Sequence, residues 1–131
     1  MEFEVKTTRR ETLVDVTRQV AEVVRTSGAD AGVAVVSSPH TTAGITVNEN
    51  ADPDVARDIL AGLEPLCPRD GDWRHFEGNS DAHLKTALVG SSATLPIAGG
   101  ALALGTWQAI YLAEFDGPRT RRVVVTVVPG L

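Results

Sequence analysis

The fold class of this chain is decided by residues 93–128, ATLPIAGGALALGTWQAIYLAEFDGPRTRRVVVTVV. Strands are predicted at 93–97, 107–115 and 121–128, with a shorter one around Leu102, because these segments are apolar and turn-type residues separate them. Only short turns join the strands, and short turns connect antiparallel neighbours. The segment therefore predicts a largely antiparallel sheet, or two sheets packed as a sandwich.

Helices are expected to cover this sheet. The chain before residue 93 has further strands predicted at 3–8, 31–36 and 44–47, from short apolar, β-branched runs. Three helices are predicted to start at Thr12, at Asp52 and at Asn79 or Ser80, because capping residues precede apolar residues spaced three or four apart. Their buried faces are expected at Leu13, Val16, Val20, Val23 and Val24; at Val55, Ile59, Leu60 and Leu63; and at Leu84, Ala87 and Leu88. This order predicts an α+β fold, with about three helices packed on the sheet.

Length and composition restrict the function classes. The 131 residues fit one domain spanning 1–131, and the net charge is −5, from 17 acidic and 12 basic residues. Without a Lys/Arg run, an acidic chain is a poor partner for nucleic acid or an anionic membrane surface. The single cysteine excludes an intramolecular disulfide and favours a reducing compartment. No apolar run approaches the roughly 20 residues that span a bilayer, and no signal peptide is evident, so we expect a cytoplasmic protein.

Histidines provide the clearest candidate for a site. The stretch 74–92, RHFEGNSDAHLKTALVGSS, holds His75 and His83, and His40 lies at a polar break between two strands. Neutral imidazole is the commonest metal ligand, and three imidazoles with one open position suit zinc. On one continuous helix the rings of His75 and His83 would point about 80° apart, whereas a loop followed by a first helical turn allows them to converge. The alternative is that each histidine is a surface or hydrogen-bonded residue.

Polar residues on apolar strands are the second candidate. In strand 107–115, Gln108 and Glu114 share a face with Ile110 and Leu112. Glu114 either forms a structural ion pair with an arginine of the 119–122 cluster or lines a cavity with Gln108. The sequence contains no phosphate-binding loop, dinucleotide fingerprint, nucleophile elbow, CxxC or HExxH motif, so the familiar hydrolase, NAD and redox classes are excluded.

Three segments together resemble the YjbQ family, small proteins often labelled secondary thiamine-phosphate synthases. The segments are SPHTTAGITVNENADPDV at 38–55, HFEGNSDAHLKTALVGSS at 75–92 and LGTWQAIYLAEFDGPRTRRV at 104–123. The resemblance covers roughly residues 10–130. It implies a compact α+β domain with a sandwich-like core, a homotrimer and weak thiamine-phosphate synthase activity, and it groups the three histidines into one cluster.

The resulting hypothesis is a metal-dependent enzyme acting on a phosphorylated small molecule. We expect a divalent metal, with zinc the best fit, held by His40, His75 and His83. Glu114 or Glu49 is the expected general base. The expected substrate-binding residues are Thr41, Thr42, Asn48, Asn79 and Gln108. Two other functions stay open: a non-catalytic protein that binds metal or a small ligand, and a structural trimer whose polar cluster only satisfies buried groups.

Overall fold

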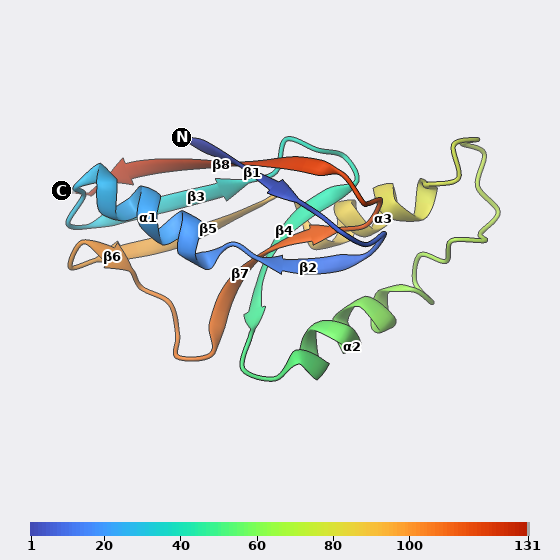
Figure 1. Ribbon diagram of the computed structural model, residues 1–131, viewed down its shortest axis with the longest axis horizontal. Helices are drawn as coiled ribbons and strands as arrows, with labels where there is room; N and C mark the ends of the chain where they lie inside the picture. Colours follow the sequence, from blue (N-terminus) through green and yellow to red (C-terminus); the bar gives the residue numbers. More distant parts are fainter. Residues whose placement is uncertain (131) are drawn as a thin grey trace.

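The computed structural model describes residues 1–130 and shows an α+β fold in which helices pack on two antiparallel sheets that curl into a half-barrel (Figure 1). The five-stranded sheet has the order β1-β8-β3-β5-β6, and the three-stranded sheet has the order β2-β7-β4. The strands are β1 (Glu2–Lys6), β2 (Thr12–Asp15), β3 (Gly32–Ser37), β4 (Ala43–Glu49), β5 (Ser92–Ala98), β6 (Ala101–Leu102), β7 (Gln108–Glu114) and β8 (Thr120–Pro129). The helices are α1 (Thr17–Ser27), α2 (Pro53–Leu63) and α3 (Ser80–Val89). The predicted fold class is confirmed.

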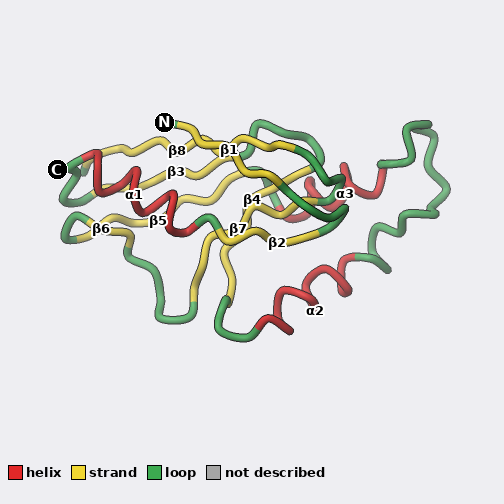
Figure 2. Tube along the Cα trace, in the orientation of Figure 1, coloured by secondary structure: helices red, strands yellow, loops and turns green. Residues whose placement is uncertain are grey.

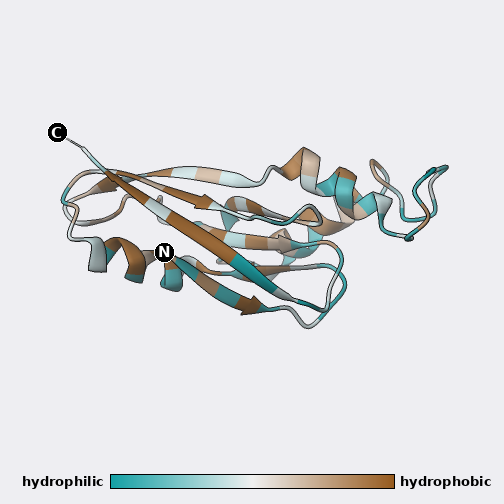
Figure 3. Cartoon of the chain, turned by 90° about the horizontal axis from the view of Figure 1, so that it is seen from above, coloured by the Kyte–Doolittle hydropathy of each residue, from teal (hydrophilic) through white to brown (hydrophobic). Residues whose placement is uncertain are grey.

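The hydrophobic core lies between the two sheets and α1. Its fully buried side chains come from both sheets and include Val36, Ile45, Ile110, Leu112 and Val123. Figure 3 shows hydrophobic residues concentrated along the strands and hydrophilic ones in the loops at one end of the sheets. A long loop between α2 and α3, residues 64–79, extends away from the sheets (Figure 2). None of the three helices in residues 1–130 combines the length and apolar character that crossing a membrane requires.

The helix predicted from Thr12 begins later than expected. Thr12–Asp15 forms β2, which pairs with β7 in the register Thr12↔Glu114 to Asp15↔Tyr111. α1 then starts at Thr17, whose N–H donates to Asp15 Oδ1 over 2.9 Å. The prediction for residues 12–15 was wrong because the β-branched segment TLVD gains ladder hydrogen bonds from β7, which helix periodicity cannot reveal.

The start of α2 was predicted correctly, but its packing was not. Asp52 is the N-cap and accepts from the N–H of Asp54 over 2.9 Å. The predicted apolar stripe from Val55 to Leu63 is only partly covered, since no residue of α2 is buried. α2 lies along the side of the molecule (Figure 1), and Val55, Ile59, Leu60 and Leu63 are each only half-buried.

α3 packs with the opposite face from the one predicted. Its buried residues are Ser80, Asp81, Ala82, Lys85 and Thr86. The predicted apolar face points outward, with Leu84 36% and Leu88 62% exposed. The expectation failed because α3 is oriented by an ionic cluster on its inner face, described below, rather than by hydrophobic burial.

Candidate functional site

Two of the predicted histidines lie side by side at the start of α3. His83 is in the first turns of α3, and His75 is in the loop that precedes it. Their ring centroids are 5.6 Å apart and the rings are nearly perpendicular, at 88°. His75 Nε2 also lies 3.7 Å from Glu77 Oε2. A loop histidine thus lies beside a helical one, an arrangement that the sequence allowed beside the alternative of separate surface histidines.

His40 lies on the other side of His83. It sits in the loop between β3 and β4 and, with Thr41, His83 and Thr86, lines an open pocket of about 400 Å³. The backbone N–H of Arg122 donates to His40 Nε2 over 2.8 Å. A neutral imidazole that accepts at Nε2 carries its proton on Nδ1.

The electrostatic environment keeps His40 neutral. Burial, together with the positive charges of Arg121 and Arg122, holds the pKa of His40 below its ordinary value, and the smaller opposing effect of Glu114 does not restore it. His40 therefore offers a hydrogen-bond donor at Nδ1 at neutral pH, and its Nε2 lone pair is already engaged.

We compared the donor set with the geometry that a metal ion needs. Zinc binds nitrogen at about 2.0–2.1 Å, so ligand atoms around one ion lie within a few ångström of each other. Among residues 1–130, the one set of three histidine, cysteine or carboxylate ligand atoms within 4.8 Å of one another is Glu11, Glu64 and Asp81. The three histidines do not meet this distance together. The imidazole nitrogens of His75 and His83 are of the kind that zinc binds. The side chain of His75 lies on a loop and is 47% exposed, so its packing leaves it room to move.

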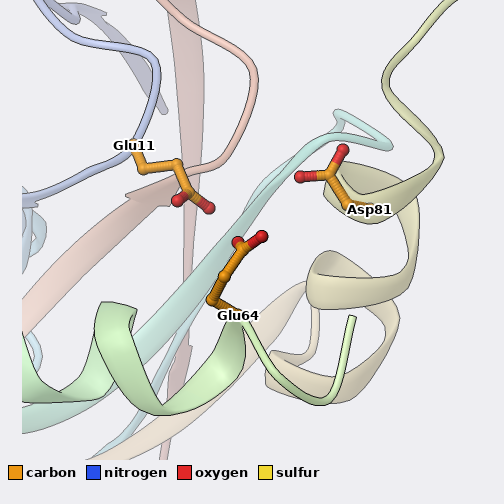
Figure 4. Close-up of side chains that lie close together, drawn as sticks. All are labelled: Glu11, Glu64 and Asp81. Atoms are coloured by element: carbon orange, nitrogen blue, oxygen red, sulfur yellow. The ribbon is translucent and has the colours of Figure 1, made fainter. Parts of the chain in front are cut away.

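The acidic cluster is an ion-pair centre. Figure 4 shows its three carboxylates converging from the loop after β1, the end of α2 and the first turn of α3. Lys85, 0% exposed, places Nζ 2.8 Å from Glu11 Oε2, 2.6 Å from Glu64 Oε2 and 3.3 Å from Asp81 Oδ2. Arg10 pairs with both oxygens of Asp81 at 3.1 and 3.2 Å. The ammonium of Lys85 supplies the positive charge that a metal would otherwise bring.

The charges of this cluster stabilise one another. Burial alone would lower the pKa of Lys85, but its bonds to Glu11 and Glu64 raise it above its ordinary value. Burial alone would raise the pKa of Asp81, but Arg10 and Lys85 lower it. In the sequence only the Asp81–Lys85 pair at i,i+4 indicates this centre, because Glu11, Glu64 and Arg10 lie in distant segments.

Glu114 forms the structural ion pair that was one of its two predicted alternatives. It is 0% exposed, and its Oε1 accepts from Thr7 Oγ1 at 2.7 Å and Arg121 Nε at 2.8 Å. Its Oε2 accepts from Arg121 Nη2 and from the N–H of Asp116. Burial alone would raise the pKa of Glu114, but these hydrogen bonds lower it below its ordinary value. Its role as a base stays a prediction, although such a carboxylate has little tendency to take up a proton.

Arg121 connects this ion pair to the histidine loop. Its Nη2 donates to Thr42 Oγ1 over 2.8 Å and to the Thr42 carbonyl over 3.3 Å. Thr42 is buried and faces Arg121, whereas Thr41 is exposed and lines the pocket. The ion pair Glu114–Arg121 therefore fixes the position of the 40–42 segment through the hydrogen bonds to Thr42.

The other predicted substrate-binding residues fall into two places. Asn79, the N-cap residue of α3, donates from Nδ2 to Asp116 Oδ2 over 2.9 Å and lies on the histidine side. Asn48, Glu49 and Gln108 lie at the far end of the β4–β7 pair, where Glu49 pairs with Gln108, while Ala43 pairs with Glu114 at the near end. Six residues along a strand span about 20 Å, so these three do not share a pocket with His40 in one chain. Gln108 Oε1 instead accepts from the N–H of Gly105 over 2.8 Å.

Comparison with known proteins places this arrangement in a family. A family model described as UPF0047 protein YjbQ-like matches residues 1–130. The chain belongs to the YjbQ-like family. A UPF0047 protein of Methanocaldococcus jannaschii is 50% identical over 126 residues, covering 96% of this chain and 91% of the relative. The UPF0047 protein YugU of Bacillus subtilis is 46% identical, covering 96% of each.

Solved structures of YjbQ-like proteins share the whole fold. An uncharacterised conserved YjbQ/UPF0047 protein of Clostridium acetobutylicum has a TM-score of 0.96 at 53% identity, covering 98% of this chain and 99% of that one. A protein of unknown function from Sulfolobus solfataricus has a TM-score of 0.95 at 34% identity, covering 99% and 96%. The YjbQ-like fold, including the long loop and α3, is thus retained at one-third sequence identity.

Proposed function

We propose that this YjbQ-like protein is a metal-dependent enzyme acting on a phosphorylated small molecule. The observation that carries the proposal is the position of His83, which lies 5.6 Å from His75, ring to ring, and lines the same pocket as His40. Thiamine-phosphate synthase chemistry, which couples a pyrimidine diphosphate to a thiazole phosphate, is the reaction class that the family resemblance adds.

In this proposal His75 and His83 bind the ion, and the third imidazole takes a different role. His40 Nε2 accepts from the N–H of Arg122, so His40 would need to break that bond to act as a ligand. A bound divalent ion, zinc by its donor set, would supply positive charge to a phosphate group leaving the substrate. A small movement of the 74–79 loop would bring the exposed His75 ring into the position that a shared ion needs.

Four basic residues in and around the histidine segments are already paired with carboxylates, and this favours a second candidate function. Lys85 is enclosed by three carboxylates, Arg121 is paired with Glu114, Arg119 with Asp116 and Arg122 with Glu2. A protein that binds metal or a small ligand without turning it over needs no cations for a diphosphate. Metal binding without turnover of any phosphorylated substrate would select this alternative.

Replacement of either histidine by alanine tests the metal site. We expect His75→Ala and His83→Ala each to weaken zinc affinity at least about tenfold, because each removes a metal ligand. Loss of a residue that only hydrogen-bonds to a ligand already costs about tenfold or more in metal affinity. Isothermal titration with zinc measures the affinity, and an assay for release of phosphate or diphosphate, including thiamine-phosphate formation, measures turnover. The control is Gln19→Ala, on the exposed face of α1. Zinc affinity equal to that of the control would refute the site.

We also propose that the protein works as a homotrimer. Supporting this, Leu84 and Leu88 point outward from α3, and the adjoining loop exposes Leu66 at 68% and Phe76 at 100%. Large exposed apolar side chains are common at protein interfaces. A second chain would also bring Asn48, Glu49 and Gln108 of one subunit within reach of the histidines of another.

Charges placed on this surface should separate the subunits. We expect Leu84→Glu combined with Leu88→Glu to reduce the particle mass in solution to that of one chain, because carboxylates in an apolar interface remain unpaired. Light scattering after gel filtration measures the mass. Gln19→Glu adds a charge to the exposed face of α1 and should leave the mass unchanged. A trimer that survives both leucine substitutions would place the interface elsewhere.

A further inference from the structure

A buried hydroxyl without a partner lies in the wall of the His40 pocket. Among residues 1–130, the buried side-chain atoms without a hydrogen-bond partner are Thr86 Oγ1 and Asn79 Oδ1. Thr86 is only 7% exposed and lines the pocket together with His40, Thr41 and Ser91. An unsatisfied buried hydroxyl is costly, and in a helix threonine has two accessible side-chain rotamers. Rotation about χ1 can therefore turn this hydroxyl toward a molecule in the pocket.

The chemistry around the pocket is that of an anion site. The lining residues provide hydroxyl groups at Thr41, Thr86 and Ser91 and an imidazole N–H at His40 Nδ1, and no carboxylate is among them. Behind them Arg121 Nη2 donates to Thr42 Oγ1, and the N–H of Arg122 donates to His40 Nε2. The bond to Nε2 leaves the proton of a neutral His40 on Nδ1.

We propose that this pocket binds the phosphate group of the substrate, with Thr86, Ser91 and the Nδ1–H of His40 as donors. Hydrogen bonds from neutral donors to a charged oxygen are among the stronger ones in proteins. The inference rests on the proposed function, because it names the place where the phosphorylated end of the substrate lies. That place is beside His75 and His83, and the phosphate does not bind to the side chains of Lys85 and Arg121, which are paired with carboxylates. The assignment gives His40 and Thr86 a binding role and leaves the ion to His75 and His83.

Inorganic phosphate, titrated into metal-free full-length protein by calorimetry, is the direct probe. We expect Thr86→Val to weaken phosphate affinity by about tenfold, the loss expected for one hydrogen bond to a charged group. Because valine has the shape of threonine and removes an unsatisfied hydroxyl, the melting temperature should stay equal or rise. Ser91→Ala should weaken affinity in the same direction, and Thr94→Val, on the exposed side of β5, should not.

The outcomes separate this inference from the proposed function. Phosphate affinity that is absent in the wild type, or unchanged in Thr86→Val and Ser91→Ala, overturns the phosphate pocket even when zinc binds at His75 and His83. Sulfate and chloride competing as well as phosphate would show an unselective ion site and would also overturn it. Phosphate binding that depends on Thr86 supports the pocket, whether or not the separate zinc titration upholds the metal site.

Discussion

Replacing Lys85 by methionine should lower the free energy of unfolding by about 3–5 kcal/mol, the usual cost of removing one partner from a buried ion pair. The ammonium of Lys85 is 0% exposed and is the group that brings Glu11, Glu64 and Asp81 together. Without it, three carboxylates repel one another at close range, and only Asp81 keeps a cation, from Arg10. Urea denaturation followed by circular dichroism measures the loss.

The matched control for this variant is Lys6→Met, which removes an exposed lysine from β1. We expect a change of about 0.5 kcal/mol or less there, as for most surface substitutions. A second, local effect should accompany Lys85→Met. Because Lys85 fixes α3 to α2 and to the loop after β1, His83 should lose its position, and the zinc affinity proposed for His75 and His83 should fall. Unchanged stability in Lys85→Met would mean that solvent already screens the cluster.

The substitution Glu114→Gln should be similarly destabilising, by about 3–5 kcal/mol, since it leaves the guanidinium of Arg121 buried without its counter-charge. Arg121 is 4% exposed, and apart from residue 114 its acceptors are the uncharged hydroxyl and carbonyl oxygens of Thr42. The double variant Glu114→Leu, Arg121→Met should recover part of the loss, because it removes both charges together. Glu4→Gln, at an exposed position of β1, is the control.

Acid titration provides a second measurement of the same ion pair. The pKa of Glu114 is lower in the folded protein than its ordinary value, so the folded state binds fewer protons than the unfolded state near that value. The stability that the pair contributes is therefore fully present above pH about 4.5 and is lost as the pH falls through the folded pKa. In Glu114→Gln the dependence of unfolding free energy on pH should become less steep over that acidic range. An equally steep curve would assign the acid sensitivity to other carboxylates.

Most of the fold could be predicted from the sequence because strands β5, β7 and β8 carry long apolar runs between turn residues. β2 was missed because four residues that pair with β7 also continue the apolar spacing of α1. The orientation of α3 was missed for a different reason. Leucine spacing predicted one buried face, but the side of the helix that packs inward is determined by Lys85 and its partners Glu11 and Glu64, which are remote in sequence.

The candidate site could be predicted from the sequence only in part. A loop running directly into a helix allowed His75 and His83 to converge, and the resemblance to the YjbQ family then favoured their grouping. The hydrogen bond between Arg122 and His40, and the pairing of Glu49 with Gln108 at the far end of the β4–β7 pair, depend on strand register. Register is a property of pairing between distant segments, and the sequence of either segment alone does not contain it.

The place of β8 between β1 and β3 has a consequence for how the protein is made. The register joins Glu2 to Val124 and Val36 to Val125, so the five-stranded sheet closes through its final strand. During synthesis, β1 and β3 leave the ribosome before β8, so the edge of each strand that pairs with β8 stays open until residues 120–129 follow. Completing this sheet therefore needs pairings between segments far apart in the sequence, which are slow to form. A ribosome that stalls before residue 120 would release a chain prone to aggregate through those two edges.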